Sequence, residues 1–362
     1  MLMTVMSSST SSSSVASTAA TNVVFEIGKY KVVLQRAEPE TTCSTKSSNI
    51  PVPPPKPLLI GMPCEAGEFP LLLLLHGYLL SNSFYSQLIQ HIASHGFIVR
   101  LVLSCWAPTK FSSNKSKIFL IRYAWGLNTD PSCFWPLYTI AGPDSTGEIK
   151  STAAITNWLS EGLQFLLPPR VQANLSKLAL AGHSRGGKVS FALALGKEGN
   201  TNRKFSALIG IDPVDGMDKG KQTPPPVLTY VPHSFDLEMA VMVIGSGLGE
   251  VKRNPLFPPC APKGVNHEDF FKECQKPACY FVAKDYGHLD MLDDETKGIR
   301  GKSTYCVCKN GKSREPMRKF VGGVVVAFLQ AYLEGDSSHL MAIRDGLDET
   351  VPVELQIVKF NL

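Results

Sequence analysis

The feature that most constrains the fold is a run that reads Leu-Ala-Leu-Ala-Gly-His-Ser-Arg-Gly-Gly-Lys-Val-Ser, from Leu178 to Ser190. An apolar segment leads directly into Gly-x-Ser-x-Gly, and a helix-forming segment follows. This order of strand, sharp turn and helix is the context of a nucleophile elbow. Gly182 and Gly186 would let strand and helix approach closely, and Ser184 Oγ would project above the carboxyl edge of a parallel sheet. The alternative is a glycine-rich turn that happens to hold a serine.

A second segment that fits this plan is the continuous apolar run from Phe69 to Tyr78, which contains His76-Gly77 near its end. Such a run is typical of a strand buried on both faces of a parallel sheet. In hydrolases of this plan, the turn after that strand supplies one N–H group to the oxyanion hole. We therefore expect the backbone N–H groups of Tyr78 and Arg185 to face the developing oxyanion.

Strands and helices alternate along the rest of the chain, which predicts an α/β fold with a mostly parallel central sheet and helices on both faces. The remaining expected strands lie at 23–37 (a pair), 58–63, 97–99, 205–213, from Pro224 (a pair), 237–249, 278–283 and 351–362, and the helices at 84–95, 147–166 and 317–333. Gly245-Ser246-Gly247-Leu248-Gly249 lacks dinucleotide-binding spacing, and we expect a flexible loop at the rim of the site.

Two aspartates are candidates for the acid that would orient a catalytic histidine. Asp212 ends the expected strand at 205–213, which is where a triad carboxylate is needed. Asp215 is a close rival. In the alternative interpretation, Asp212 only begins an Asp-Pro turn.

The candidate general base is His288, in a Gly-His turn after the strand at 278–283. The order Ser, Asp, His along the chain is the one that this fold requires. Among the eight histidines, His267 and His233 are rivals.

Composition excludes several classes of function. Of the 362 residues, 44% are hydrophobic and 19% are charged, as in an ordinary globular protein. The net charge of +5 is scattered along the chain, so we expect no nucleic-acid partner and at most a mild attraction to anionic surfaces. No segment is long and apolar enough for a transmembrane helix.

The nine cysteines lack the spacing of a zinc site, so we expect no metal. Cys260, Cys274 and Cys279 could allow a local disulfide, and Cys306-Val-Cys308 a metal or redox pair. We expect reduced cysteines or one regulatory disulfide.

The ends of the chain differ in composition from its centre. Residues 1–22 are uncharged and rich in serine, which predicts a disordered extension or a plastid transit peptide, although such peptides usually carry arginine. Residues 23–335 form the expected hydrolase domain, and 336–362 a C-terminal tail.

Beyond the elbow, the chain resembles plant chlorophyllases, members of the α/β-hydrolase superfamily. The Ser-Arg-Gly-Gly form of the elbow is far more specific than Gly-x-Ser-x-Gly alone. The segments that carry the resemblance are Leu75-His76-Gly77-Tyr78, Asn82-Ser83-Phe84-Tyr85, Leu137 to Asp144, Gly182 to Lys188, Ala207 to Val214, Tyr286 to Asp290 and Phe320 to Val326. Together they cover most of residues 23–335.

The resemblance implies a serine esterase that cleaves the phytyl ester of chlorophyll and needs no cofactor. The triad would be Ser184, Asp212 and His288, and residues near Tyr78, Phe84, Tyr85 and Leu248 would line an apolar cleft. It also implies a chloroplast location, with the cytosol or an endomembrane as alternatives, and peripheral contact with pigment-bearing membranes. The alternative functions are a general carboxylesterase or lipase, and an inactive splice variant of this fold.

One segment departs from the family. About 35 residues, from Arg100 to Pro136, separate segments that lie close together in the chain of family members. They hold three of the four tryptophans and show no sustained periodicity. We interpret 100–136 as an atypical insertion, arising from splicing or a gene model, that impairs folding or activity.

Overall fold

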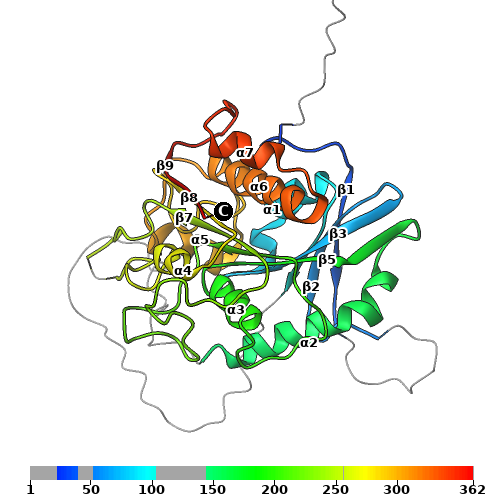
Figure 1. Cartoon of the computed structure of the whole chain (residues 1–362), viewed down its shortest axis with the longest axis horizontal. Coiled ribbons are helices and arrows are strands. Elements are labelled where there is room, and N and C mark those ends of the chain that lie inside the picture. Colours follow the sequence, from blue (N-terminus) through cyan, green and yellow to red (C-terminus); the bar gives the residue numbers. More distant parts are fainter. Residues whose placement is uncertain (1–22, 40–51, 103–143, 256, 362) are drawn as a thin grey trace, which may run out of the picture.

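The computed structural model describes residues 23–39, 52–102, 144–255 and 257–361. One sheet runs through this part of the chain, with nine strands in the order β1-β2-β4-β3-β5-β6-β7-β8-β9. The six strands from β4 to β8 in that order are parallel, and β1, β2 and β9 are antiparallel to their neighbours. The predicted α/β-hydrolase architecture is confirmed (Figure 1).

The elements have the following bounds. The strands are β1 (Val32–Ala37), β2 (Leu58–Pro63), β3 (Gly67–Leu75), β4 (Ile98–Val102), β5 (Val171–His183), β6 (Ala207–Ile211), β7 (Ala240–Ser246), β8 (Ala278–Ala283) and β9 (Leu355–Asn361). The α-helices are α1 (Ser86–Ser94), α2 (Thr146–Gly162), α3 (Arg185–Ala194), α4 (His267–Glu273), α5 (Gly298–Val307), α6 (Glu315–Leu329) and α7 (Ser338–Arg344). Short helical turns lie at η1 (Asn82–Phe84), η3 (Leu163–Leu166) and η4 (Gln330–Glu334).

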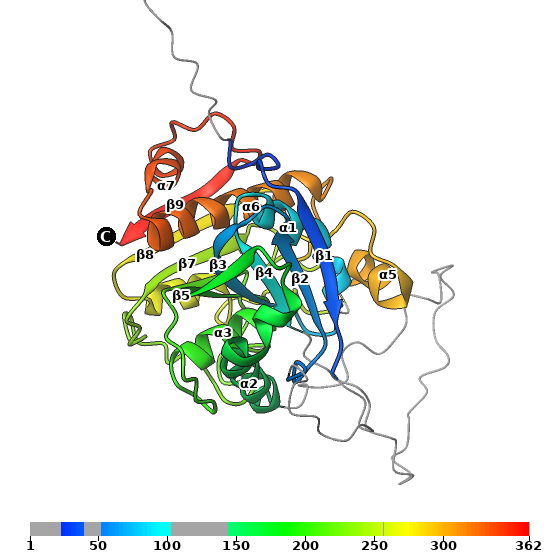
Figure 2. The same ribbon diagram turned by 90° about the vertical axis from the view of Figure 1, so that its right-hand side faces the viewer.

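Helices cover both faces of the sheet and create two hydrophobic cores. Helices α1 and α6 lie on one face, and α2 and α3 on the other (Figure 2). The alternating side chains of β3 supply both cores, since Leu72 and Leu74 belong to the first and Leu71 and Leu73 to the second. This explains why β3 reads as an unbroken run of leucine.

The parallel register brings the functional turns to one edge of the sheet. Gly182 near the end of β5 lies opposite Leu75 of β3 and Gly210 of β6. The chain segments after β3, β5, β6, β7 and β8 therefore leave from the same carboxyl edge, where ligands bind in open α/β sheets.

Several expected element boundaries were wrong. Only one strand, β1, lies within residues 23–37, and the strand pair expected from Pro224 is absent, since the next strand along the chain is β7. Strand β4 continues to Val102, so Arg100 belongs to the sheet rather than to the expected insertion; its guanidinium stacks on Trp158, 4.2 Å from the ring centroid. The rest of 100–136, up to Pro136, lies outside the described residues, as does the expected extension at 1–22.

The C-terminal residues 336–362 are more than a tail. Helix α7 packs against α6, and β9 pairs with β8 at the edge of the sheet. The last strand therefore covers an edge that would otherwise expose unpaired backbone groups.

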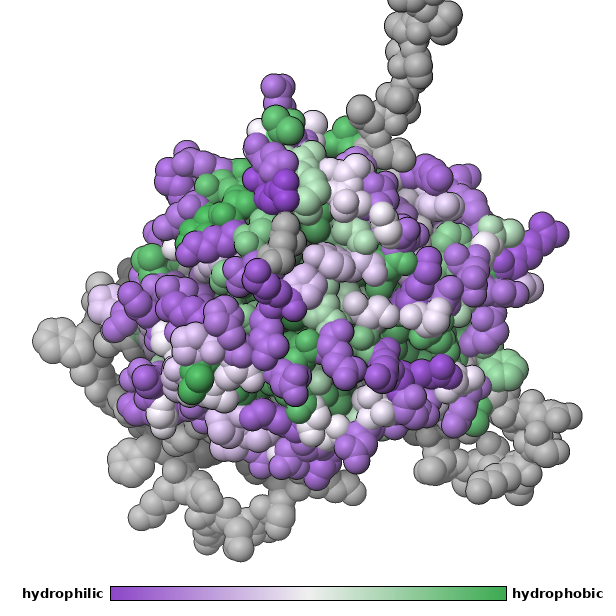
Figure 3. Space-filling view, viewed as in Figure 1, coloured by the Kyte–Doolittle hydropathy of each residue, from purple (hydrophilic) through white to green (hydrophobic). Residues whose placement is uncertain are grey.

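On the face shown in Figure 3, hydrophobic residues lie in separate patches among hydrophilic ones. Within the described ranges, none of the helices combines the length and the apolar character that a membrane crossing requires.

Candidate active site

The turn between β5 and α3 has the geometry of a nucleophile elbow. Ser184 has φ 57° and ψ −124°, a strained conformation for a residue other than glycine. A Cβ at Gly182 would lie 2.1 Å from the Gly186 carbonyl oxygen, and one at Gly186 would lie 2.5 Å from that of Leu75. Both positions therefore require glycine, as the sequence predicted.

His288 lies within hydrogen-bonding distance of both Ser184 and Asp212. The Nε2 of His288 is 2.8 Å from Ser184 Oγ, and its Nδ1 is 2.7 Å from Asp212 Oδ2. Because an ionised carboxylate only accepts hydrogen bonds, the proton lies on Nδ1 and leaves Nε2 free to accept from the serine hydroxyl. This is the tautomer that a general base for Ser184 needs.

His288 is held in place through its backbone by a chain of buried groups. His183 Nε2 donates to the His288 carbonyl oxygen at 2.8 Å, so its Nδ1 must accept from the Tyr85 hydroxyl at 2.7 Å. The Gly77 N–H in turn donates to Tyr85 Oη at 3.0 Å. Burial lowers the pKa of His183 to about 3, which keeps the ring neutral and preserves these donor and acceptor roles.

The turn that carries His288 is fixed at its other end by Asp290. The Asp290 carboxylate accepts from the backbone N–H groups of Gly287 at 2.7 Å and Gly311 at 2.6 Å. A Cβ at Gly287 would lie 1.8 Å from the Lys309 carbonyl oxygen, so this turn packs tightly on the segment after α5.

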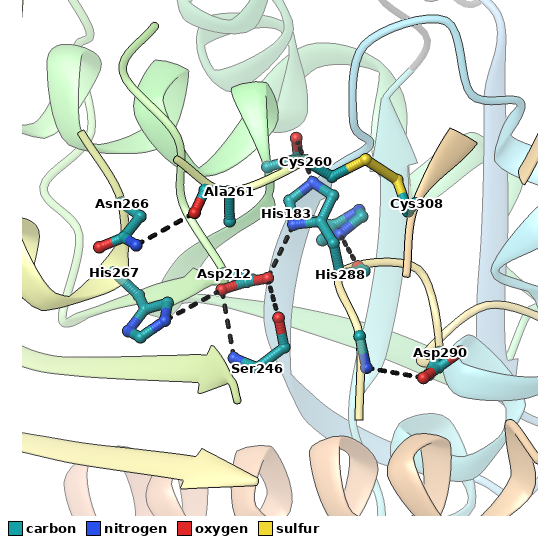
Figure 4. A network of polar contacts seen from close by, with 12 residues as sticks. His183, Asp212, Ser246, Cys260, Ala261, Asn266, His267, His288, Asp290 and Cys308 are labelled. Carbon is teal, nitrogen blue, oxygen red and sulfur yellow. Dashed lines mark hydrogen bonds and ion pairs between the residues drawn. A yellow bond between two sulfur atoms is a disulfide. The ribbon is translucent and has the colours of Figure 1, made fainter. Parts of the chain in front are cut away.

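Asp212 accepts hydrogen bonds from strand β7 as well as from His288. The Ser246 hydroxyl donates to Oδ2 at 2.5 Å, and the Ser246 N–H donates to Oδ1 at 3.2 Å (Figure 4). Burial raises the pKa of Asp212, but the hydrogen bond from His288 and the donors around it outweigh burial and lower this pKa to about 2. Asp212 therefore carries a full negative charge beside the imidazole.

The rival candidates have other partners. Asp215 lies 2.8 Å from Lys188 Nζ and accepts from the backbone N–H groups of Val227 and Leu228, so it links α3 to the loop after β6. His233 Nδ1 donates to the Cys274 carbonyl oxygen at 2.8 Å. His267 does approach the site, with Nε2 at 3.7 Å from Asp212 Oδ1, on the side opposite His288.

The chain segments that carry the expected oxyanion donors lie close to Ser184. Arg185 is the first residue of α3, where backbone N–H groups lack partners within the helix. Gly77, which precedes Tyr78, lies so close that a Cβ on it would be 3.2 Å from Ser184 Cβ. The Arg185 guanidinium stacks over the Tyr78 ring at 5.1 Å, which brings these two chain segments together.

The comparisons with known proteins agree with this geometry. A family model described as Chlorophyllase matches residues 20–111 and 135–362. Chlorophyllase-2 of Arabidopsis thaliana is 58% identical over 336 residues, which are 92% of this chain and 95% of that protein. Chlorophyllase-1 of Arabidopsis thaliana is 40% identical, over 90% of this chain and 89% of the relative. For "Chlorophyllase-1, chloroplastic" of Citrus unshiu the identity is 41%, over 88% of this chain and 84% of the relative.

The chain belongs to the chlorophyllase family.

The match to the chlorophyllase family is interrupted inside the expected insertion. The family model leaves out residues 112–134, and these fall within 100–136. The origin of this segment and its effect on activity stay predictions.

The cysteines of this chlorophyllase-family chain pair differently from the expectation. Cys260 is bonded to Cys308, 48 residues further along the chain, and Cys306 is also disulfide-bonded. Cys274 and Cys279 are free and buried. The expectation of reduced cysteines or one disulfide is therefore wrong, since Cys306 is bonded in addition to the Cys260–Cys308 pair. Neither the possible local disulfide nor a pair of Cys306 with Cys308 is formed, because the fold brings distant loops together.

Two of the expected cleft residues belong to the core. Phe84 and Tyr85 are buried, whereas Tyr78 is 37% exposed and Leu248 is half-buried. Sequence reasoning also missed Ser246 and His183 as partners of the site. Ser246 ends β7 at the same sheet edge as Asp212, a position from which its role could have been inferred.

Proposed function

We propose that this chlorophyllase-family protein hydrolyses the phytyl ester of chlorophyll to chlorophyllide and phytol, with Ser184 as nucleophile. The observation that carries the proposal is the pair of hydrogen bonds of 2.8 Å and 2.7 Å that join Ser184 to His288 and His288 to Asp212. The curated relatives named as chlorophyllases, up to 58% identical over nearly their whole length, support the substrate.

The reaction begins when His288 Nε2 takes the proton of Ser184 Oγ, which attacks the carbonyl carbon of the ring propionate ester. Asp212 stabilises the imidazolium that forms. The backbone N–H groups of Tyr78 and Arg185 bind the oxyanion of the tetrahedral intermediate.

The leaving alkoxide of phytol takes the proton from His288, which leaves an acyl-enzyme on Ser184. Water, deprotonated by His288, then attacks the acyl carbonyl and releases chlorophyllide. The resting enzyme is restored by return of the proton to Ser184 Oγ.

The experiment compares the wild type with Ser184→Ala, with chlorophyll a as substrate and the pigments separated by HPLC. We expect the variant to lose at least about 10⁴-fold in turnover while its circular dichroism spectrum stays unchanged, because the nucleophile is absent. Chlorophyllide formation by the folded variant at the wild-type rate would refute the assignment. A wild type that cleaves p-nitrophenyl esters but no chlorophyll would indicate a general esterase.

A second part of the proposal concerns where the enzyme acts. "Chloroplastic" in the names of the Citrus relatives supports a chloroplast location. Exposed apolar residues follow three strands at the carboxyl edge, namely Tyr78, Met217 and Val251. Lys219, Lys221, Lys252 and Arg253 are exposed in the same loops, a mixture suited to an anionic membrane surface that holds the pigment.

Co-sedimentation with vesicles tests this contact. We expect the wild type to bind vesicles that contain anionic lipid and Val251→Asp with Lys252→Glu to bind them several-fold more weakly. Binding that is equal for both proteins would contradict the contact.

A further inference from the structure

Asp212 lies between two histidines rather than one. His288 approaches Oδ2, and His267 Nε2 lies 3.7 Å from Oδ1 (Figure 4). At 3.7 Å this second approach is an electrostatic contact rather than a hydrogen bond. Both rings are buried, so the contact is only weakly screened by solvent.

The orientation of the His267 ring is fixed by groups that have no part in the triad. Its Nδ1 lies 2.7 Å from the Tyr280 hydroxyl, which comes from β8. Burial raises the pKa of Tyr280, so the hydroxyl keeps its proton and can donate to Nδ1. With Nδ1 accepting, the single proton of a neutral ring lies on Nε2 and points its positive end at Asp212.

The backbone around His267 is shaped to receive the ring. A Cβ at Gly245 would lie 2.4 Å from His267 Nδ1, so glycine in β7 leaves the space that the ring fills. Asn266 accepts from the Glu268 N–H at the start of α4 and donates to the Ala261 carbonyl oxygen at 3.1 Å. Gly245 thus leaves room for the His267 ring, in a segment that the sequence had indicated as a flexible loop at the rim of the site.

We propose that His267 is a positioning residue for the triad, which acts through Asp212. With the Ser246 N–H, which also binds Oδ1, it neutralises part of the Asp212 charge on the oxygen away from His288 and keeps Oδ2 directed at His288 Nδ1. This role rests on the proposed function of Ser184, Asp212 and His288.

The direction of the change in pH dependence on removal of His267 follows from the charges around Asp212 and His267. The groups that face Asp212 are His288, His267, His183 and the Ser246 hydroxyl. The groups that face His267 are Asp212 and Tyr280, and the carboxylates of Glu250, Glu268 and Asp269 lie further out. Removal of the His267 dipole leaves more of the Asp212 charge to stabilise protonated His288. The base then stays protonated to higher pH.

The test is the pH profile of kcat/KM for p-nitrophenyl butyrate, which is independent of pigment recognition. We expect His267→Leu to move the acid limb upward by about 0.5 to 1 pH unit and to lower kcat about threefold to tenfold with little change in KM. Tyr280→Phe, which frees the ring to change tautomer, should give a smaller shift in the same direction. His267→Gln, whose amide can donate from the place of Nε2, should restore most of the wild-type profile.

The matched control is His91→Leu, since His91 is also a buried histidine but donates to the Val24 carbonyl oxygen beside α1. It should lower thermal stability without moving the acid limb. Should His267→Leu fail to fold, Tyr280→Phe decides, and an acid limb unmoved in the folded variant would overturn the proposal.

Failure of the proposed function is recognised separately by proton NMR. The low-field resonance of the His288 Nδ1 proton, identified by its loss in Asp212→Asn, should shift in His267→Leu whether or not chlorophyll is cleaved. An unshifted resonance overturns the positioning role, whereas absence of turnover by wild type overturns only the catalytic assignment.

Discussion

The proposed triad is assembled from two kinds of structure. Ser184 and Asp212 each follow the last residue of a parallel strand, and both have positive φ, 57° and 44°. Their backbone N–H groups continue the sheet, from Ser184 to Ile211 and from Asp212 to Ile244. His288 lies on a loop after β8, and side chains hold it: His183, Asp290 and Asp212.

This difference shows that the positions of Ser184 and Asp212 are set by the sheet, whereas the position of His288 is set by side-chain contacts. The strand-end residues are placed by backbone hydrogen bonds that any folded form of the sheet must make. The loop histidine depends on individual side chains, so single substitutions can displace it while the fold survives.

The largest expected effect is on the strand-end acid. Asp212→Asn should reduce kcat on chlorophyll by about 10⁴-fold, because an amide favours the wrong imidazole tautomer in His288. Steady-state kinetics on the purified variant measures this, with the exposed Asp285→Asn as control. A loss below about tenfold would mean that another group orients the histidine.

A smaller loss of activity should follow from a substitution that removes a bond holding His288 in its loop. His183→Leu removes the donor to the His288 carbonyl, and we expect a loss of about 10- to 100-fold in kcat/KM with retained circular dichroism. Tyr85→Phe keeps the ring of His183 and should cost less. If His183→Leu is as active as wild type, the loop does not depend on this bond.

The next prediction concerns the Cys260–Cys308 disulfide, which holds the segment after α5 on which the His288 turn packs. Cys308→Ser should lower the free energy of unfolding by about 2–4 kcal/mol, because the bond joins the segment between β7 and α4 to the residue directly after α5, 48 residues further along the chain. Thermal unfolding measures the loss, and the exposed free Cys64→Ser is the control. Equal melting temperatures of both variants would contradict the structural role.

The smallest effect is on acid stability. The pKa of Asp212 is about 2 in the folded protein against 3.8 for an unperturbed aspartate, so its ionised form stabilises the fold above pH 4. This contribution, about 2 kcal/mol, is lost as the pH falls through 2. Urea unfolding of wild type and Asp212→Asn should show the difference between them narrowing below pH 4, and a constant difference would contradict it.

The sequence predicted the strand-end half of the site well and the loop half only in part. The motif around Ser184 determines the turn and the need for Gly182, whose Cβ would meet Gly186 within the same turn, whereas the need for Gly186 comes from its contact with the end of β3. His288 was inferred from its order in the chain, and the position of Ser246 at the end of β7 could have indicated its contact with Asp212, but nothing in the sequence around His183 signals the bond that it makes. The Cys260–Cys308 disulfide and the position of His267 beside Asp212 depend on tertiary contacts between segments that are far apart in the sequence.

The central claim is that Ser184 is the one nucleophile that His288 activates. Reaction with a fluorophosphonate, followed by peptide mass spectrometry and the pigment assay, tests it most directly. We expect one adduct per chain, on Ser184, formed in step with the loss of chlorophyllide production and absent in His288→Gln. Complete labelling of Ser184 with undiminished chlorophyll hydrolysis, or inactivation through an adduct on another residue, would contradict the account.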